Sequence, residues 1–221
     1  MKIICYMYSS LDGRIDCEMT EKIDPKATAY YNYFNNCGIK NQINGKTTHA
    51  LHYAEKGEFK AKNYVPCGAG FYVAQKSEEY QICYDTMGTL LWNSNDIGGK
   101  KLICVVSEKA SSEYLEYLKS KNISYIACGT EKIDLGESVK ILEKEFGVTS
   151  ALLTGGGHLN ASFLDAGLIS EVHMMYGPGI DGRTGWTCAF DGRSQEKNPV
   201  VLKLLDVQKC EGGAVLIKYE V

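Results

Sequence analysis

The stretch "ALLTGGGHLNASFLDAGLISEVHMMY", residues 151–176, joins an apolar run to a helix-like pattern through three consecutive glycines. "SALLT" (150–154) has the composition of a buried strand, and Leu159 and Phe163 recur at helical spacing ahead of Gly167. A strand that leads straight into a helix leaves the first N–H groups of that helix unpaired, at the positive end of its dipole. The glycines either let a phosphate approach those donors or only permit close packing of strand and helix.

The residues before and after this stretch decide the fold class. The strand-like runs "KLICVVS", "ISYIAC" and "SALLT" alternate with the helical patterns "SSEYLEYLKSKN" and "LGESVKILEKEFG". This alternation predicts right-handed crossovers and a largely parallel sheet. The later runs "ISEVHMMY", "PVVLKLLDVQKC" and "AVLIKYEV" lack intervening helices and predict antiparallel strands. We therefore expect an α/β fold with a central mixed, mostly parallel sheet flanked by helices, and the glycines at the carboxyl end of a strand.

The first hundred residues are less regular. "KIICYMY" predicts a first strand, and "SSLDGRI" predicts a turn after it. A helix is expected over 25–38, with Pro25 in its first turn and Gly38 as its stop, and residues 44–57 are expected as a loop that enters a second helix ending at Gly57. Residues 58–99 mix short β-prone pieces with Gly and Asn clusters, which predicts a hairpin or an irregular insertion.

Composition narrows the class of protein. The 221 residues, 44% hydrophobic and 23% charged, suit a single domain over 1–221. A net charge of -3 provides no basic surface for nucleic acid or an anionic membrane. Neither a signal-peptide pattern nor an apolar run of ~18 residues is present, so we expect a cytoplasmic protein without a membrane partner. The nine cysteines contain no CxxC pair, so they are interpreted as reduced packing residues and no metal site is expected.

Two other loops offer donors for phosphates and hydroxyls. "NGKTTHAL" places Gly45, Lys46, Thr47 and Thr48 at a loop-to-helix junction, and Ser107 ends the run "LICVV". Together with the glycine turn they suit a ligand as long as a dinucleotide, although Thr47 or Thr48 could simply cap the helix and Ser107 could start the next one. No GxGxxG follows the first strand and no GxxxxGK[ST] occurs, which disfavours a Rossmann or P-loop protein.

Four motifs carry a resemblance to a known family. "SSLDGRI" (9–15), "NGKTT" (44–48), "LLTGGGHLNASFLDAGLISEV" (152–172) and "GPGIDGRTG" (177–185) resemble the RibD C-terminal domain family, the pyrimidine reductases of riboflavin biosynthesis. The resemblance covers essentially the whole chain and implies a dihydrofolate-reductase-like fold, NADPH as hydride donor and a small heterocyclic substrate. The first expectation is a pyrimidine such as 5-amino-6-(5-phosphoribosylamino)uracil. A dihydrofolate- or pterin-type reductase, a non-catalytic dinucleotide sensor and an enzyme that binds another phosphate ligand remain alternatives.

The resemblance also implies a role for each motif residue. Asp12 would stand beside the reacting centre and help to protonate the acceptor, or would only form a turn with Gly13. Thr154 would lie on the substrate side of the site. Ser107 would lie near the adenosine ribose or its 2′-phosphate. Ser9 and Ser10 would line the nicotinamide. The phosphate on the adenosine side would be held by Gly45, Lys46, Thr47 and Thr48. The diphosphate would be held by Gly155, Gly156, Gly157, His158, Leu159 and Asn160.

The sequence departs from the family pattern at two places. The family usually has Glu in place of Thr154, and it carries Arg where this chain has "NYFNNCG", which favours a diverged stand-alone reductase. His49 and His52 are expected as a surface or partly buried pair, and His173 as a structural residue of a strand. The resemblance implies a homodimer, with the apolar run "AVLIKYEV" as either its interface or a sheet interior.

Overall fold

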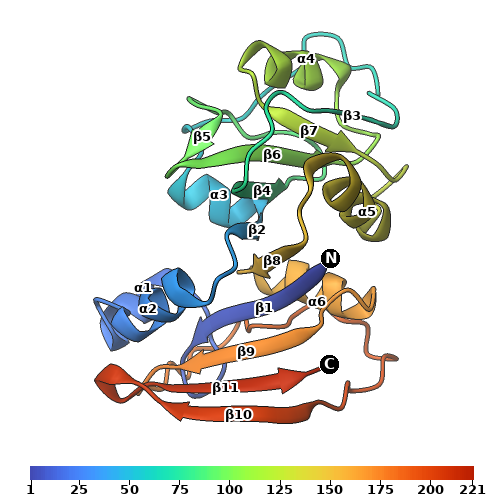
Figure 1. Cartoon of the computed structure of the whole chain (residues 1–221). Helices are drawn as coiled ribbons and strands as arrows, with labels where there is room; N and C mark the ends of the chain where they lie inside the picture. Colours follow the sequence, from blue (N-terminus) through green and yellow to red (C-terminus); the bar gives the residue numbers. More distant parts are fainter. The chain divides into compact units, whose positions relative to one another are not determined.

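The computed structural model describes residues 1–221 (Figure 1), which group into two compact units. The central unit contains Met1 and Lys40–Ala151, and the terminal unit contains Lys2–Ile39 and Leu152–Val221. The division falls within strand β8 (Ser150–Leu153). The single domain expected over 1–221 stays a prediction. No helix has both the length and the apolar character needed to span a membrane.

The central unit is built on parallel strands. Its strand order is β2-β4-β6-β7-β3. The parallel members are β2 (Asn41–Gly45), β4 (Tyr80–Tyr84), β6 (Lys100–Val106) and β7 (Ser124–Ala127). Two short strands are antiparallel: β3 (Gly70–Tyr72) on β7 and β5 (Asp96–Ile97) on β6. Because the four parallel strands point the same way, their carboxyl ends share one edge of the sheet.

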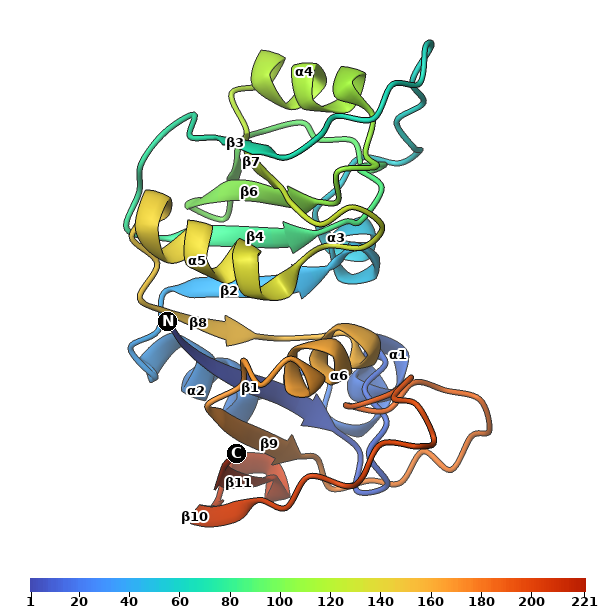
Figure 2. The same ribbon diagram turned by 90° about the vertical axis from the view of Figure 1, so that its right-hand side faces the viewer.

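Helices cover both faces of this sheet. α3 (Lys46–His52) and α4 (Ser112–Ser120) lie on one face, where α4 buries Tyr114, Leu115 and Leu118, and α5 (Leu135–Phe146) lies on the other (Figure 2). The rings of Phe146 and Tyr80 meet edge to face at 5.7 Å between centroids. Both helices begin at side-chain caps, Ser111 for α4 and Asp134 for α5, which satisfy N–H groups of the first turn.

The terminal unit mixes parallel and antiparallel strands in the order β10-β11-β9-β1-β8. β1 (Lys2–Ser9) pairs in parallel with β9 (Glu171–Tyr176), whereas β11 (Val215–Glu220) is antiparallel to both β9 and β10 (Lys203–Lys209). The helices are α1 (Cys17–Ile23), α2 (Thr28–Asn36), α6 (Gly157–Asp165) and the short 3-10 turn η1 (Glu211–Gly213). The rings of α2 pack on Tyr6 of β1, whose ring stacks on Tyr30 at 4.6 Å.

The predicted fold class is confirmed, because both units are α/β, the central sheet is mainly parallel and the chain ends in antiparallel strands. The helix expected over 25–38 is shorter: it begins at Thr28, since Ala27 has a left-handed φ of 41° and Pro25 precedes the helix. The helix expected to reach Gly57 ends at His52. Sequence patterns also missed α1 and β2.

The interpretation of residues 58–99 as a hairpin or insertion is wrong for one element. β4 is completely buried and pairs with β2 on one side and β6 on the other. Its sequence, "YQICY", contains the amide of Gln81, which interrupts the apolar run that a central strand normally shows. The remainder of the segment is irregular, with only β3 and β5 as short strands.

Candidate functional site

Each of the three glycines after β8 has a different structural role. Gly155 adopts a φ of +107°, which side chains rarely tolerate, and the peptide that joins it to Gly156 is cis. A Cβ on Gly157 would fall on the carbonyl oxygen of Cys188, so this glycine permits a close backbone approach. Gly156, by contrast, has an ordinary φ of -73° and no atom within 4 Å of the position a Cβ would take. Only Gly156 therefore leaves space open beside the turn.

The first turn of α6 keeps its N–H groups uncapped. Gly156 is the N-cap residue, and no side chain accepts a hydrogen bond from the helix start. The turn thus leaves backbone donors and the positive end of the helix dipole next to open space, the kind of geometry at which anions bind in other proteins.

The other residues predicted in this turn differ in accessibility. His158 is exposed, Leu159 is half-buried, and Thr154 is half-buried directly after β8. Asn160 is fully buried, where its Nδ2 donates to the carbonyl of Ala189 at 2.7 Å. Its Oδ1 is buried without a hydrogen-bond partner. Asn160 therefore ties α6 to the backbone at Ala189, and its Oδ1 remains available to accept a hydrogen bond.

Ser9 and Ser10, at the end of β1, have no exposed surface. The hydroxyl of Ser9 donates to the carbonyl of Ser10 at 2.9 Å, and the hydroxyl of Ser10 donates to Oδ1 of Asp12 at 2.7 Å. The amide of Arg14 in turn donates to the Ser10 hydroxyl at 3.0 Å. Both hydroxyls are consequently fixed by the protein rather than free to rotate.

The carboxylate of Asp12 is an acceptor for three hydrogen bonds. Besides the Ser10 hydroxyl, it accepts from the amides of Asp181 at 2.9 Å and Gly182 at 2.8 Å. These bonds, that from Ser10 first, hold the pKa of Asp12 well below its usual range. Asp12 is ionised at neutral pH and cannot donate a proton there, and the turn at Asp12–Gly13 is closed by Gly13 donating to Ser10.

A segment that we call the strap, residues 181–192, joins the end of β1 to the start of α6. The amide of Ala189 donates to the carbonyl of Gly13 at 3.2 Å, and the amide of Asp191 donates to the carbonyl of Gly157 at 3.2 Å. The structure therefore brings the serine turn and the glycine turn together within the terminal unit, with the strap as their common support.

Two arginines hold the strap, and no sequence motif predicted this role for them. Nη1 of Arg14 donates to the carbonyl of Trp186 at 2.5 Å and lies 3.0 Å from Sγ of Cys188. The guanidinium of Arg183 forms an ion pair with Asp181 and lies 4.1 Å from the centre of the Trp186 ring. The only signal in the sequence was the turn-rich "GPGIDGRTG", which indicates a loop but not its contacts.

A pocket of about 710 Å³ lies at the same end of the terminal unit. Its walls include Leu11 beside Asp12, Tyr176 at the end of β9, Pro178, Val215 and Ile217. No charged side chain lines it. The volume is in the range of small-molecule sites.

In the central unit, Gly45, Lys46, Thr47 and Thr48 lie at the junction of β2 and α3, as the sequence predicted. Gly45 is the N-cap of α3, and neither threonine makes a capping hydrogen bond, so the capping alternative is wrong. Nζ of Lys46 lies 3.2 Å from Oε1 of Glu58. This exposed ion pair partly neutralises the charge of the lysine.

Under this junction lies a buried polar network. Nδ1 of His49 is 3.1 Å from the carbonyl of Gly45, and Nε2 is 3.3 Å from Nε2 of Gln81, which also donates to Asn44 at 2.8 Å. These contacts fit a neutral ring that donates from Nδ1 and accepts at Nε2. Burial lowers the pKa of His49 to about 4. His49 is thus completely buried, unlike the surface or partly buried pair expected with His52.

Ser107 is also less accessible than a ligand contact requires. It has no exposed surface, and its hydroxyl donates to the carbonyl of Thr86 at 2.8 Å, which ties the ends of β6 and β4. The following carboxylate, Glu108, accepts from the amide of Gly129 after β7 at 3.0 Å. Gly45 ends a parallel strand, and Thr86, Ser107 and Gly129 follow parallel strands, so all four lie at the carboxyl edge of the central sheet.

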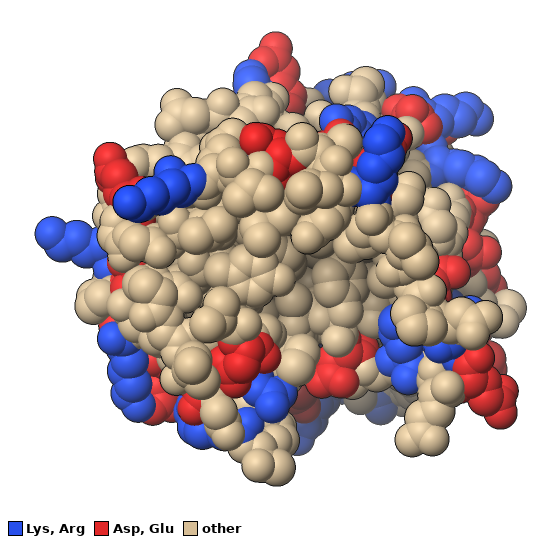
Figure 3. Space-filling model, turned by 90° about the horizontal axis from the view of Figure 1, so that it is seen from below, with Lys and Arg blue, Asp and Glu red and all other residues tan.

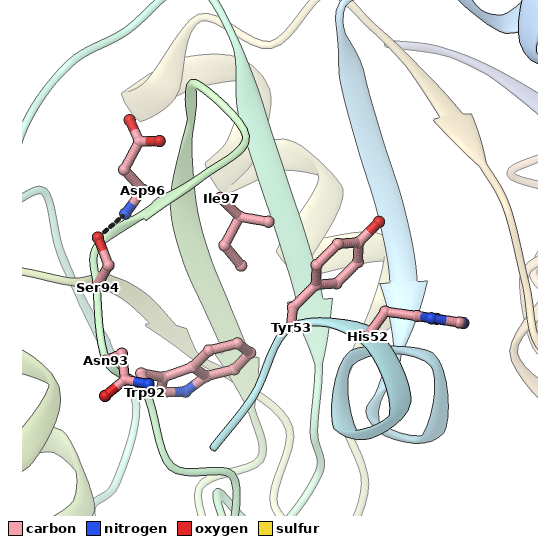
Figure 4. A pocket seen from close by; sticks show the side chains of 7 residues that line it. All are labelled: His52, Tyr53, Trp92, Asn93, Ser94, Asp96 and Ile97. Carbon is pink, nitrogen blue, oxygen red and sulfur yellow. Dashed lines mark hydrogen bonds between the residues drawn. The ribbon is translucent and has the colours of Figure 1, made fainter.

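A second, smaller pocket of about 250 Å³ lies at the far end of α3 from Lys46 (Figure 4). The rings of Trp92 and Tyr53 and the side chain of Ile97 point into it, whereas His52 points away. This pocket includes none of the predicted site residues. No group of three or more His, Cys, Asp or Glu side chains is arranged to hold a metal ion.

The mostly parallel α/β sheet with an antiparallel end and the glycine turn after β8 agree with the dihydrofolate-reductase-like fold that the sequence predicted. The model of the RibD C-terminal domain matches residues 86–216, and the chain belongs to this family. A curated relative from Methanothermobacter thermautotrophicus is a 2,5-diamino-6-ribosylamino-4(3H)-pyrimidinone 5′-phosphate reductase. It is 29% identical over 117 residues, which cover 52% of this chain and 53% of the relative. The matched region thus spans about half the length of that protein.

Solved structures share the fold across the whole chain. A pyrimidine reductase-like protein from Corynebacterium diphtheriae has a TM-score of 0.73 and 12% identity, with 100% of this chain and 91% of that chain covered. The riboflavin biosynthesis reductase of Saccharomyces cerevisiae has a TM-score of 0.64 and 16% identity, with 99% and 89% covered. At these identities the likeness concerns the fold alone.

Proposed function

We propose that the protein is a reductase that uses a nicotinamide dinucleotide, NADPH, to reduce a small planar heterocycle. The observation that carries the proposal is the open position at Gly156, beside the uncapped first turn of a nine-residue helix. Membership of the RibD C-terminal domain family and the name of the curated relative support a pyrimidine as the acceptor, such as 5-amino-6-(5-phosphoribosylamino)uracil.

The residues present fit a dinucleotide at the glycine turn. The N–H groups at the start of α6 would hold diphosphate oxygens, because no side chain of the protein occupies them. The unpaired Oδ1 of buried Asn160 is an acceptor that a ligand or a water molecule beside it would satisfy. The exposed ring of His158 lies in the same turn.

A bound nicotinamide dinucleotide would supply the hydride, and the protein would supply alignment. Ser9 and Ser10 are buried and their hydroxyls are engaged, so they would shape the turn on the nicotinamide side rather than offer free hydroxyls to the ligand. Asp12 acts in this proposal as a positioning residue, because its ionised carboxylate holds the Ser10 hydroxyl and the amides of the strap. The proton for the acceptor would come from water, since Asp12 is not a proton donor at neutral pH.

The adenosine side of the proposal rests on Gly45, Lys46, Thr47 and Thr48 at the carboxyl edge of the central sheet. Open α/β sheets bind ligands at this edge. Ser107 would contribute by tying β6 to β4 rather than through a free hydroxyl, since that hydroxyl already donates to Thr86. The substrate-side role of Thr154 remains part of the proposal.

A dinucleotide sensor without turnover is the second candidate. The specific observation in its favour is that Asp12, the candidate acid, already accepts three hydrogen bonds as a carboxylate. The family's usual carboxylate is also replaced by Thr154.

A thermal-shift titration with NADPH and NADH tests both candidates. A ligand at 100 times its dissociation constant adds ~2.7 kcal/mol to the free energy of unfolding, which raises Tm by roughly 5–10 °C for a chain of this size. No shift with either nucleotide would reject both candidates. A shift without NADPH oxidation across a panel of pyrimidines and pterins would favour the sensor.

A further inference from the structure

The imidazole of His158, the second residue of α6, is exposed, and neither of its nitrogens forms a hydrogen bond within the chain. One edge of the ring lies against the end of the strap. A Cβ on Gly192 would come within 2.6 Å of Cδ2 and 2.9 Å of Nε2 of this ring. The backbone of Gly192 therefore supports the Nε2 edge, and Nδ1 lies on the other edge of the ring.

The direction of a helical side chain places this ring over the open position at Gly156. In an α-helix the bond from Cα to Cβ tilts towards the N-terminus, so a side chain covers the turn that precedes its own residue. For His158 that turn begins at the N-cap Gly156, where no atom lies within 4 Å of the position a Cβ would take. A titratable ring thus lies beside the uncapped N–H groups of α6.

No other cation of α6 or the strap is available to an anion at this turn. α6 contains no Lys or Arg. The strap contains Arg183, whose guanidinium is held in ion pairs with Asp181 and Asp16. Histidine is the side chain that ordinarily changes its charge between pH 5 and 8. The positive charge that α6 and the strap can offer here therefore depends on the protonation of His158.

The other charged groups around the ring come from the strap and from the end of α6. Asp191 precedes Gly192, whose amide donates to its carboxylate at 2.8 Å. Asp165 of α6 is paired with Arg193 at 2.8 Å, so these two charges offset each other. A neutral ring would thus leave an anion at the turn beside the negative charge of Asp191. On the face of the molecule shown in Figure 3, Lys and Arg are interspersed with Asp and Glu, so that face offers an anion no continuous basic surface.

A dinucleotide diphosphate carries a negative charge on each phosphate, whereas the start of a helix provides only about half a positive charge. On the basis of the proposed function, we propose that His158 binds the diphosphate in its protonated form. Nucleotide binding at the glycine turn then takes up a proton, and it strengthens as the pH falls.

Isothermal titration calorimetry of the full chain with NADP⁺ tests this linkage, because the oxidised nucleotide is stable in acid. Between about pH 8.5 and pH 6, Kd should fall roughly five-fold more for the wild type than for His158→Gln, the gain expected from a charge pair about 4 Å apart in water. The 2′-phosphate of NADP⁺ also titrates near pH 6. It does so with both proteins, so the difference between them belongs to His158.

The number of protons taken up is measured in the same experiment. The observed enthalpy changes between two buffers in proportion to their ionisation enthalpies and to the protons bound, and His158→Gln should bind fewer protons than the wild type. His52→Gln is the matched control, because His52 is also exposed but lies at the far end of α3 from Lys46. It should keep the proton uptake of the wild type, and circular dichroism should show that both variants are folded.

Equal proton uptake by the wild type and a folded His158→Gln would overturn the proposal and leave the proposed function intact. A protein that binds no nucleotide at any pH would reject both. If His158→Gln does not fold, nuclear magnetic resonance of the wild type replaces it. The His158 ring should then stay protonated to higher pH with NADP⁺ than without it, and an unchanged titration would contradict the proposal.

Discussion

Replacing Gly156 by Asp should abolish nucleotide binding while leaving the protein folded. The backbone at Gly156 is in an extended conformation open to any residue, with φ -73° and ψ 177°, and its added Cβ would meet no atom within 4 Å. Asp is moreover a good N-cap residue, so the free energy of unfolding should stay within a few tenths of a kcal/mol or rise. Its carboxylate would take the helix N–H groups that the diphosphate needs.

The magnitude follows from charge repulsion at the turn. A carboxylate about 4 Å from a phosphate charge costs ~1 kcal/mol at the dielectric of water and ~4 kcal/mol at an effective value of 20. Since 1.4 kcal/mol is a tenfold change in affinity, we expect Kd for NADPH to rise by roughly five-fold to a thousand-fold, before the loss of the helix donors is added.

Isothermal titration calorimetry with NADPH measures this change directly. Gly156→Asn serves as the matched control, because it has the size of Asp without the charge and should bind more tightly than Gly156→Asp. Gly70→Asp adds the same charge at an open glycine of the central unit and should bind like the wild type. A folded Gly156→Asp with wild-type affinity would refute the diphosphate site.

Three further changes test other parts of the structure. Gly157→Ala should lower the free energy of unfolding by ~1–3 kcal/mol in urea titrations, because the new Cβ falls on the Cys188 carbonyl; an unchanged midpoint would contradict the packing. The pKa of His49 is about 4 in the folded protein, below the usual 6.5. As the pH falls, the unfolded chain therefore takes up the proton first. The free energy of unfolding, at its full value above pH 6.5, should fall by about 3 kcal/mol towards pH 4. His49→Gln should flatten that part of the pH dependence of urea unfolding, and an identical slope would argue against a buried neutral ring. Asp12→Asn should accelerate hydrogen exchange of the amides at 181–182 because one acceptor oxygen is lost; unaltered protection would show that the carboxylate does not hold the strap.

The regular part of the fold was predictable because its signals are local. The helices α4 and α5 carry apolar side chains at helical spacing and side-chain caps at their starts, and the neighbouring strands β6 and β7 are mostly apolar. The run that forms β4 was recognised as β-prone, but its central position was missed because Gln81 is buried in a network with Asn44 and His49, residues distant in sequence. Only the folded chain reveals that such an amide is satisfied.

The candidate site was predictable in its residues but not in their roles. The glycine run signalled the turn, yet only the contact with the Cys188 carbonyl separates Gly157, which packing requires, from Gly156, which leaves space open. Asp12 was a candidate acid by position, and its engagement by Asp181 and Gly182 depends on a strap about 170 residues away. Long-range contacts of this kind leave no periodic trace in a sequence.

The most direct test of the central claim is a crystal structure of the protein with NADPH. The proposal predicts diphosphate oxygens within hydrogen-bond distance of the N–H groups at the start of α6, next to Gly156, with the nicotinamide near Ser9 and Ser10. A well-defined nucleotide whose diphosphate lies away from the glycine turn would contradict it.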